Sequence, residues 1–567
     1  MVFLISSLLS ILAMPQDIVW GDSPELTASA WVLGVPHPTG YPLYLLLTRI
    51  MQALPLGTVA FRAHLLSALL TASACTLLYL FLCRILQSHY RNSLWLTTFP
   101  ALLSVFTFRL TSIVWDQAQI SEVYPLFNLL FVSLLMLLPY IQQKKQGAGA
   151  FLLFLIGLNL IHHRLAVFLI LATGLLWLYL NMTDKSYRTS NSALPGSVSS
   201  IYLLQCGCIL LLPFLLLLYF PLRATHDPPV NWFDPDTLTQ FQQLISGGQY
   251  STILQRGILT LFTYFHFPWV LYCLFLPFML FSFSGLLALG GFIPLYRRIP
   301  WLAVFTLGLY LVYQCFLMIY PVGDWSTFLL PALILLTIPT AFAAAALLDL
   351  LQKQAVKQSI IAITKTVLAL IALTPLLTTP EISVYQSNWS AIFPKSLQQA
   401  CQRFALVHFT ATTDYATQVW QWTPWNSAII SGLFELTADN EYYPLLYQQV
   451  VERRHPDTPI IGSGFLLYDW YREQLNRKLP FDLELYGDRP AASREEWHED
   501  TWLSLVQPLT QDTLVITPSY PLPSTWYPPR ARIRHLGKIQ MDNSSFPHFY
   551  QNYIPSGEVY QISAYQE

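Results

Sequence analysis

The sequence predicts an α-helical polytopic membrane protein that ends in a soluble α/β domain. Hydrophobic residues make up 54% of the 567 residues and charged residues only 11%, whereas about 25% of the residues of a soluble protein are charged. Long apolar runs recur up to residue 380 and lack period-2 alternation. Because backbone groups in lipid must pair within a helix or a closed barrel, these runs are expected to be helices.

Eleven apolar runs are expected to form the transmembrane helices of a domain covering residues 1–379. A span normally needs about 20 residues. The first run is shorter, and because it lacks a charged n-region we interpret it as a membrane helix rather than a cleaved signal. The fifth and sixth are also short and meet at His162, His163 and Arg164. The runs are residues 2–14, 64–83, 94–110, 125–141, 150–161, 165–180, 201–221, 262–293, 301–319, 328–350 and 360–379.

Every second connection between these runs carries a basic pair. If the N-terminus lies inside, these are the cytoplasmic connections. The pairs are Arg84 and Arg91, Lys144 and Lys145, Lys185 and Arg188, Arg297 and Arg298, and Lys353 and Lys357. The positive-inside rule places such connections in the cytoplasm. The other connections, including a loop at residues 15–63, and the domain at residues 380–567 are therefore expected outside.

The domain at residues 380–567 is predicted to be an α/β layer structure. Short apolar stretches at 427–431, 458–461 and 513–517 are typical of buried strands. Helical patterns lie between them at 442–453 and 466–476.

Charge and cysteine usage exclude several function classes. The formal net charge is −1 and no long basic run is present, so nucleic acid is not expected as a partner. Six of the seven cysteines lie in apolar segments, and their spacing predicts neither a disulfide framework nor a zinc site.

The outer loop carries an acidic pair, Asp22 and Glu25, in the stretch GDSPEL. Asp-x-x-Glu with Pro24 between is close to a capping box, which would open a helix over residues 24–33 on the bilayer surface. The same carboxylates could serve catalysis, since a capping residue is also held rigid. The residues alone leave both interpretations open.

The acidic loop and several later stretches resemble one known family. GDSPEL followed by HPTGYPL, which contains His37 and Tyr41, is similar to the G-D-S-G-E-L and H-P-P-G-Y-P-L of transmembrane protein O-mannosyltransferases. These enzymes belong to the GT-C class of membrane glycosyltransferases. Pro24 and Thr39 depart from the family wording.

The later matches lie in other outer connections, and the resemblance as a whole extends over nearly the whole chain. They are Glu122 in QISEVYPL, His163 at the His of the family's G-N-H-L-T, Arg223 in PLRA, Asn231 and Trp232 in PPVNWFDP, and Asp324 in PVGDW. The stretch SGGQY lacks the Arg of the family's S-G-R-x-Y, so an anion site there would be filled from elsewhere, for instance by Arg256.

The resemblance implies a GT-C-like fold and inverting transfer of a sugar, mannose by the family's name. The donor would be a polyprenyl-phosphate sugar, and the acceptor a hydroxyl of a protein or glycan outside the plasma (inner) membrane of a bacterium. Asp22 is expected to be the base, with Glu25 or Glu122 orienting the acceptor or a metal. Arg223 and His163 are expected at the phosphate. Further substrate contacts are expected from His37, Tyr41, Asn231, Trp232 and Asp324. The need for a divalent cation stays open.

Each candidate also has a structural interpretation, and the chain has a rival function. Glu122 could favour a helix N-terminus, and Arg223 could snorkel at a helix end. The rival function is a polytopic transporter or lipid flippase. Such proteins place ionisable residues near the midplane in broken helices, often with inverted repeats, whereas here the charges lie in the outer loops.

Overall fold

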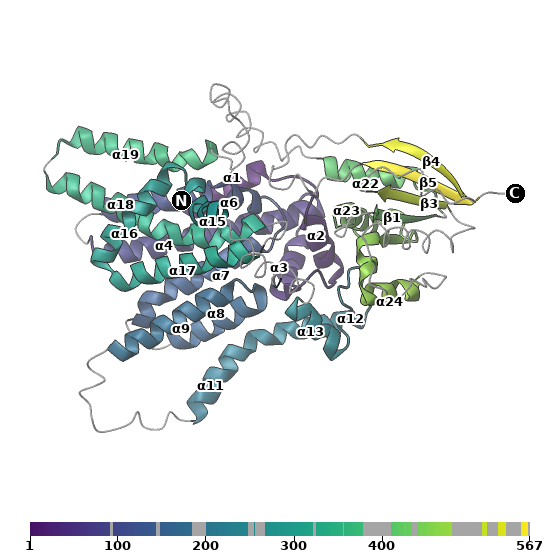
Figure 1. The fold of residues 1–567 in the computed structure, drawn as a ribbon, viewed down its shortest axis with the longest axis horizontal. Helices are drawn as coiled ribbons and strands as arrows, with labels where there is room; N and C mark the ends of the chain where they lie inside the picture. Colours follow the sequence, from purple (N-terminus) through teal and green to yellow (C-terminus); the bar gives the residue numbers. More distant parts are fainter. Residues whose placement is uncertain are drawn as a thin grey trace.

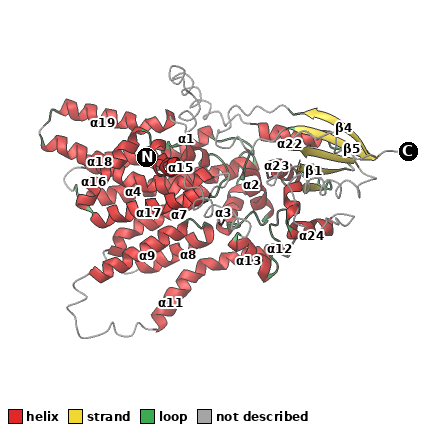
Figure 2. Cartoon of the chain, in the orientation of Figure 1, coloured by secondary structure: helices red, strands yellow, loops and turns green. Residues whose placement is uncertain are grey.

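The structure, a computed structural model, is a helical bundle joined to a mixed β-sheet (Figures 1 and 2). It describes residues 1–90, 94–142, 148–183, 200–247, 255, 267–320, 325–354, 356–377, 410–425, 427–433, 439–478, 513–518, 531–539 and 557–564. The predicted combination of membrane helices and a C-terminal α/β region is confirmed. The boundary near residue 380 lies outside the described residues.

Every predicted apolar run contains helix. The helices before residue 380 are α1 (Val2–Ala13), α2 (Ser23–Val32), α3 (Pro42–Gln52), α4 (Val59–Gln87), α5 (Trp95–Arg109), α6 (Ser112–Gln117), α7 (Tyr124–Gln142), α8 (Ala148–His162), α9 (Ala166–Thr183), α11 (Ser200–Leu211), η1 (Leu212–Leu218), α12 (Tyr219–Ala224), α13 (Leu238–Ser246), α15 (Phe267–Leu280), α16 (Phe283–Arg298), α17 (Pro300–Ile319), η2 (Trp325–Leu329), α18 (Leu330–Lys353), α19 (Gln358–Leu373) and η3 (Thr374–Leu377).

Several of these helices are long and apolar enough to cross a membrane. Within the described residues, length and composition identify four spans, at Val59–Gln87, Leu204–Ala224, Pro300–Ile319 and Ser326–Lys353. Five shorter apolar helices accompany them, at Val2–Ala13, Tyr124–Tyr140, Gly149–His162, Ala166–Leu176 and Gln358–Leu373. The chain is therefore a helical membrane protein with several spans.

The run at 262–293 differs from the straight span that its hydropathy predicts. α15 and α16 meet at an angle of 111°. Ser282 interrupts the helix with a φ of 55°, and Gly285 lies so close to Phe278 that a Cβ would be 2.1 Å from its carbonyl oxygen. Hydropathy measures apolar content and does not detect such a break.

The C-terminal region is a five-stranded mixed sheet in the order β2-β1-β3-β5-β4. Its strands are β1 (Ser427–Leu433), β2 (Ile460–Gly462), β3 (Thr513–Pro518), β4 (Ala531–Lys538) and β5 (Glu558–Ala564). The pairs β1–β2 and β1–β3 are parallel, and β3–β5 and β4–β5 are antiparallel. The accompanying helical segments are α22 (Ala411–Trp422), α23 (Asp439–Val450), η6 (Ser463–Leu467) and α24 (Asp469–Lys478).

The segment before α2, α2 itself and the segment after α12 share one hydrophobic core with this C-terminal region. Val19, Trp20 and Ala28 cluster with buried residues of α22, α23 and β1. In Figure 1, α2 accordingly lies between the bundle and α23. The residues of α2 from Ser23 to Ala30 are all buried, so this helix is packed inside the protein rather than lying on the bilayer surface as predicted.

Candidate active site

The acidic loop is held at the junction of the two regions by backbone contacts. Gly21, whose φ of 89° suits a residue without a Cβ, donates its N–H to Asn440 Oδ1 at 2.9 Å. The chain then runs through α2 to its C-cap, Leu33. Just beyond it, Val35 forms a β-bridge with Asn231. The chain has reversed at this point, and His37 returns to the first turn of α2, where it contacts Glu25.

His37 is thereby placed between the two carboxylates of the loop. Glu25 accepts two hydrogen bonds from it, one from the backbone N–H at 2.8 Å and one from Nδ1 at 2.7 Å. On the other side of the ring, Nε2 lies 3.7 Å from Asp22 Oδ2. An ionised carboxylate only accepts, so the bond to Glu25 fixes the hydrogen on Nδ1 and turns Nε2 toward Asp22.

This geometry favours a chemical role for Asp22 over a capping role. Asp22 occupies the N-cap position of α2, yet its side chain makes no capping hydrogen bond. Its side chain is 37% exposed, whereas that of Glu25 is 3% exposed. The accessible carboxylate is therefore Asp22, and Glu25 is buried behind His37.

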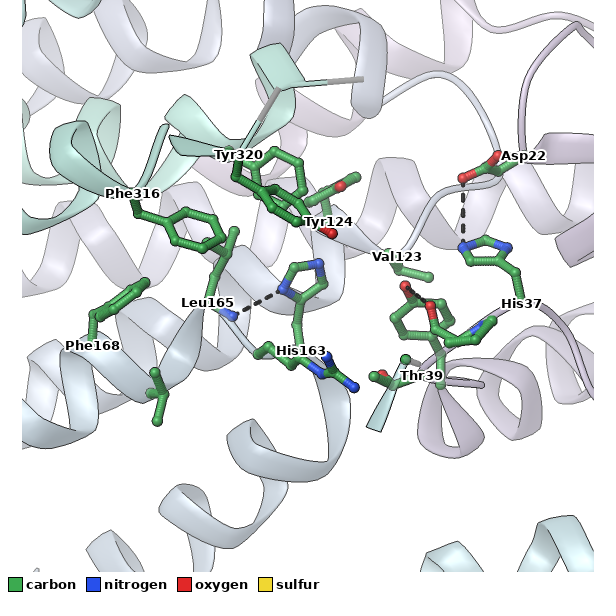
Figure 3. A pocket seen from close by; sticks show the side chains of 16 residues that line it. Asp22, His37, Thr39, Val123, Tyr124, His163, Leu165, Phe168, Phe316 and Tyr320 are labelled. Carbon is green, nitrogen blue, oxygen red and sulfur yellow. Dashed lines mark hydrogen bonds and ion pairs between the residues drawn. The ribbon is translucent and has the colours of Figure 1, made fainter. Parts of the chain in front are cut away.

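Asp22 and His37 line a cavity of about 310 Å³, at the small end of the range for small-molecule sites. Its walls differ in chemistry, and Figure 3 shows Asp22 and His37 on one side with Phe168 and Phe316 on the other. The complete lining is Asp22, His37, Pro38, Thr39, Tyr41, Val123, Tyr124, His163, Arg164, Leu165, Val167, Phe168, Gly247, Phe316, Tyr320 and Phe328. A ligand with a polar head and an apolar tail would match these two walls.

His163 lies between the polar and apolar walls. Its ring is stacked near Tyr41, with centroids 6.3 Å apart, and its Nδ1 accepts the backbone N–H of Leu165 at 3.2 Å. Burial, followed by the charges of nearby basic residues, lowers the pKa of His163 to about 3. The imidazole is therefore neutral at physiological pH and contributes no positive charge.

Arg164 is the only arginine or lysine among the described residues that line the cavity. Its Nη2 donates to the carbonyl of Ile245 at 2.5 Å. The guanidinium also lies against Gly247, where a Cβ would be 2.9 Å from Nη2. The sequence interpretation gave this residue no role, because it departs from the family wording at that position.

Several of the predicted residues, Glu122 and Arg223 among them, lie outside the cavity lining. Glu122 is buried and accepts the N–H of Val123 at 3.3 Å, although Val123 and Tyr124 line the cavity. Arg223 donates through Nε to the carbonyl of Leu33 at 2.7 Å and through Nη2 to that of Val32 at 3.2 Å. It thus binds the last carbonyls of α2.

The remaining predicted residues are distributed around the site. Tyr41 lines the cavity, and its hydroxyl donates to the Pro38 carbonyl at 3.2 Å. Asn231 donates to Asp234 at 2.7 Å. Trp232 packs edge-on near His37 and donates to the Tyr443 hydroxyl at 2.6 Å. Asp324 and Arg256 lie outside the described residues.

The Asp22, Glu25 and His37 trio has the donor set of a divalent cation site. One ligand atom from each residue lies within 4.8 Å of the others, and carboxylate and imidazole both ligate divalent metals. Binding through Glu25 would have to compete with the two hydrogen bonds that it accepts from His37.

The N-terminal part of the chain is similar to known proteins. Residues 22–186 match the family model described as Protein O-mannosyl-transferase TMEM260 N-terminal domain. "Protein O-mannosyl-transferase TMEM260" of Mus musculus is 38% identical over 128 residues, which are 22% of this chain and 17% of that protein. Its counterpart in Dictyostelium discoideum is 30% identical over 142 residues, 24% of this chain and 16% of that protein. The chain thus aligns with less than a fifth of the length of either relative.

Among solved structures, ArnT from Cupriavidus metallidurans is similar at 12% identity. The alignment covers 91% of this chain and 92% of ArnT, with a TM-score of 0.47 for the apo state and 0.41 for the state bound to undecaprenyl phosphate. The matched region, residues 22–186, holds Asp22, His37 and His163. This part of the chain, which contains the acidic loop and much of the cavity, is similar to the TMEM260-like protein O-mannosyltransferases.

Proposed function

We propose that the chain is a GT-C membrane glycosyltransferase that moves a sugar, mannose by its relatives' names, from a polyprenyl-phosphate donor to a hydroxyl acceptor. One observation carries the proposal: a partly exposed carboxylate, Asp22, lines the same cavity as a cation, Arg164, and an apolar wall. Glycosyl transfer from a lipid phosphate needs these three elements together.

Asp22 acts as the general base in the proposed reaction. Its carboxylate takes the proton of the acceptor hydroxyl while that oxygen forms a bond to the anomeric carbon. The bond between the anomeric carbon and the phosphate oxygen breaks, its electron pair stays on the phosphate, and the configuration inverts. His37 Nε2, held toward Asp22 by the bond to Glu25, can receive the proton afterwards.

Arg164, rather than Arg223, stabilises the leaving phosphate. A guanidinium can present two parallel N–H groups to a phosphate. Arg164 faces the cavity, and it packs against Gly247, the residue before the position at which the family's S-G-R-x-Y carries an arginine. The contact supports the interpretation that Arg164 supplies the cation that this chain lacks in that motif.

The apolar wall suits the first isoprenoid units of the donor. Phe168, Phe316 and Phe328 line it, and two of them belong to α9 and α17, which are apolar membrane helices. The acceptor is a protein hydroxyl, as the names of the relatives indicate. The alternating basic connections support a site on the outer face of the membrane, and the proposed membrane is the plasma membrane of a bacterium.

Asp22→Asn tests the assignment of the base. The substitution keeps side-chain size and a capping oxygen but removes the proton acceptor, so transfer should fall about 10²–10⁴-fold with thermal stability unchanged. The assay uses the purified full chain, polyprenyl-phosphate mannose and a Ser/Thr acceptor peptide.

Asp457→Asn is the matched control. Asp457 is an exposed acidic residue that does not line the cavity, and its replacement should leave the rate of transfer near that of the unmodified chain. Near-normal turnover by Asp22→Asn would contradict the assignment and would direct the search to Glu25. Donor translocation without glycosyl transfer would instead support the flippase.

A further inference from the structure

A second cavity, of about 750 Å³, lies where the end of α4 meets α7 and the turn between α16 and α17. It is remote from the Asp22 cavity. α17 has Trp301 at the second cavity and Phe316 at the first. This helix has 20 residues, or about 30 Å of length, which is about the thickness of the hydrocarbon core. The two cavities therefore open at opposite faces of the membrane.

Two arginines in the second cavity are held by aromatic rings. The guanidinium of Arg84 lies 3.9 Å from the ring centroid of Tyr140 and donates to its hydroxyl at 2.8 Å. The guanidinium of Arg298 lies 4.5 Å from the ring centroid of Tyr90. Stacking fixes the plane of a guanidinium and leaves N–H groups at its edge for an anionic ligand.

Positive charge exceeds negative charge at this site. Asp349 pairs with both Arg298, at 3.5 Å, and Lys353, at 2.9 Å. In the described part of the chain, Arg84 has no carboxylate within ion-pair distance, and its side chain contacts Tyr140. Ser88 and His89 add polar groups to the lining. An anion with several acceptor oxygens would complete the charge balance.

An exposed apolar surface begins next to the cavity. From Trp301 onward α17 exposes Val304, Leu307 and Leu311, which are 63%, 44% and 42% exposed and lie on one side of the helix at spacings of three and four residues. On a membrane-spanning helix these side chains face lipid. A ligand with its anionic group in the cavity would therefore have space for acyl chains along α17.

We propose that this cavity binds the phosphate headgroup of an anionic phospholipid, on the face of the membrane opposite the Asp22 site. Basic pockets between transmembrane helices on the cytoplasmic side bind such headgroups, and the basic connections of this chain, Arg84 and Arg298 among them, are those that the positive-inside rule places there. The bound lipid joins α4 to the turn between α16 and α17. The site does not depend on the glycosyltransferase proposal.

Native mass spectrometry of the delipidated full chain in detergent tests the site. The chain is titrated with phosphatidylglycerol or with phosphatidylcholine of the same acyl chains. The unmodified protein should retain phosphatidylglycerol about tenfold more tightly than phosphatidylcholine. Arg84→Gln should lose this preference. Arg297→Gln should keep it, because Arg297 is an exposed neighbour that does not line the cavity.

Ser88→Phe tests the cavity without removing a charge. Ser88 lies exposed at the lining, so the larger side chain should block the headgroup and reduce retention as Arg84→Gln does. Equal retention of the two lipids by the unmodified chain, or equal effects of Arg84→Gln and Arg297→Gln, would overturn the proposal. So would displacement of the lipid by inorganic phosphate alone, which would identify a free anion as the ligand.

Discussion

His37 contacts two carboxylates whose different environments divide their roles. Glu25 is buried and accepts both the backbone N–H and the Nδ1–H of His37, whereas Asp22 is partly exposed, lines the cavity and lies 3.7 Å from Nε2 of His37. A buried carboxylate that is fully engaged orients its neighbour, while an exposed one can meet substrate. The sequence supplied the acidic pair, but its division of roles depends on the chain reversal that brings His37 back to α2.

Arg164 and Arg223 should respond differently to the same substitution. Arg164→Gln should raise the KM for the lipid-phosphate donor and lower kcat, with little change in thermal stability, because Arg164 faces the cavity. Arg223→Gln should instead lower stability by about 1–3 kcal/mol, since a charged donor to the carbonyls of Leu33 and Val32 is lost. Donor kinetics and thermal unfolding of both variants separate the two roles. If only Arg223→Gln raised the KM for the donor, the phosphate contact would be assigned to Arg223, as the family motif predicts.

At the scale of elements, the sequence predicts helices and buried strands well and predicts breaks and exposed strands poorly. β1 and β3 were predicted from apolar runs, and the structure confirms them. β4, with the sequence ARIRHLGK, has no such run, and it pairs only with β5 in the sheet order. An edge strand is set by its partner rather than by its own burial. In the site, His37 was found through its motif, whereas Arg164 depends on the packing of α8, α9 and α13.

The short first helix is held in the bundle by a buried arginine. α1 has 12 residues, fewer than a span normally needs. Arg109 of α5, fully buried, donates to the hydroxyls of Ser6 at 2.9 Å and Ser10 at 2.6 Å, and lies 5.0 Å from the ring centroid of Trp115. Polar side chains on a short apolar helix therefore serve as acceptors for this cation.

Removing the two hydroxyl acceptors should cost more stability while Arg109 is present than after Arg109 has been replaced. The double variant Ser6→Ala/Ser10→Ala leaves a buried guanidinium without its hydroxyl partners and should cost about 3–5 kcal/mol. In an Arg109→Met background the same change should cost much less, since no buried charge remains. Thermal unfolding in detergent measures the cycle. Ser7→Ala is the control, because the Ser7 hydroxyl has no partner among the described residues; additive effects would contradict the coupling.

For the whole molecule, the loop that carries Asp22 is also the surface on which the C-terminal region packs. Trp20 packs edge-on against Tyr415, with centroids 5.7 Å apart, and Gln474 donates to the Asn231 carbonyl at 2.6 Å. Asp234 and Arg477 form an ion pair across the same junction. The C-terminal region therefore helps to hold the base of the proposed reaction in place, and a change at this junction should reach the active site.

We expect Asp17 to make this junction sensitive to pH. Burial raises its pKa, against the opposing effects of a hydrogen bond from Ile18, of Thr413 and of Arg454. Burial likewise raises the pKa of Glu452, to which Asp17 adds like charge. A carboxyl with a raised folded-state pKa contributes stability that is present below its unfolded pKa, about 3.9 for Asp, and that is lost as the pH rises through the folded-state value.

Asp17→Asn should therefore reduce the pH dependence of stability. In the unmodified chain, the packing of α22 and α23 on the loop should weaken from acidic to neutral pH, and in the variant it should weaken less, because the amide stays neutral throughout. Hydrogen exchange of these two helices, followed across that pH range in both proteins, measures the difference. Equal pH profiles would mean that Asp17 is as well solvated in the folded chain as in the unfolded chain, and the coupling between pH and the active-site loop would have to come from Glu452.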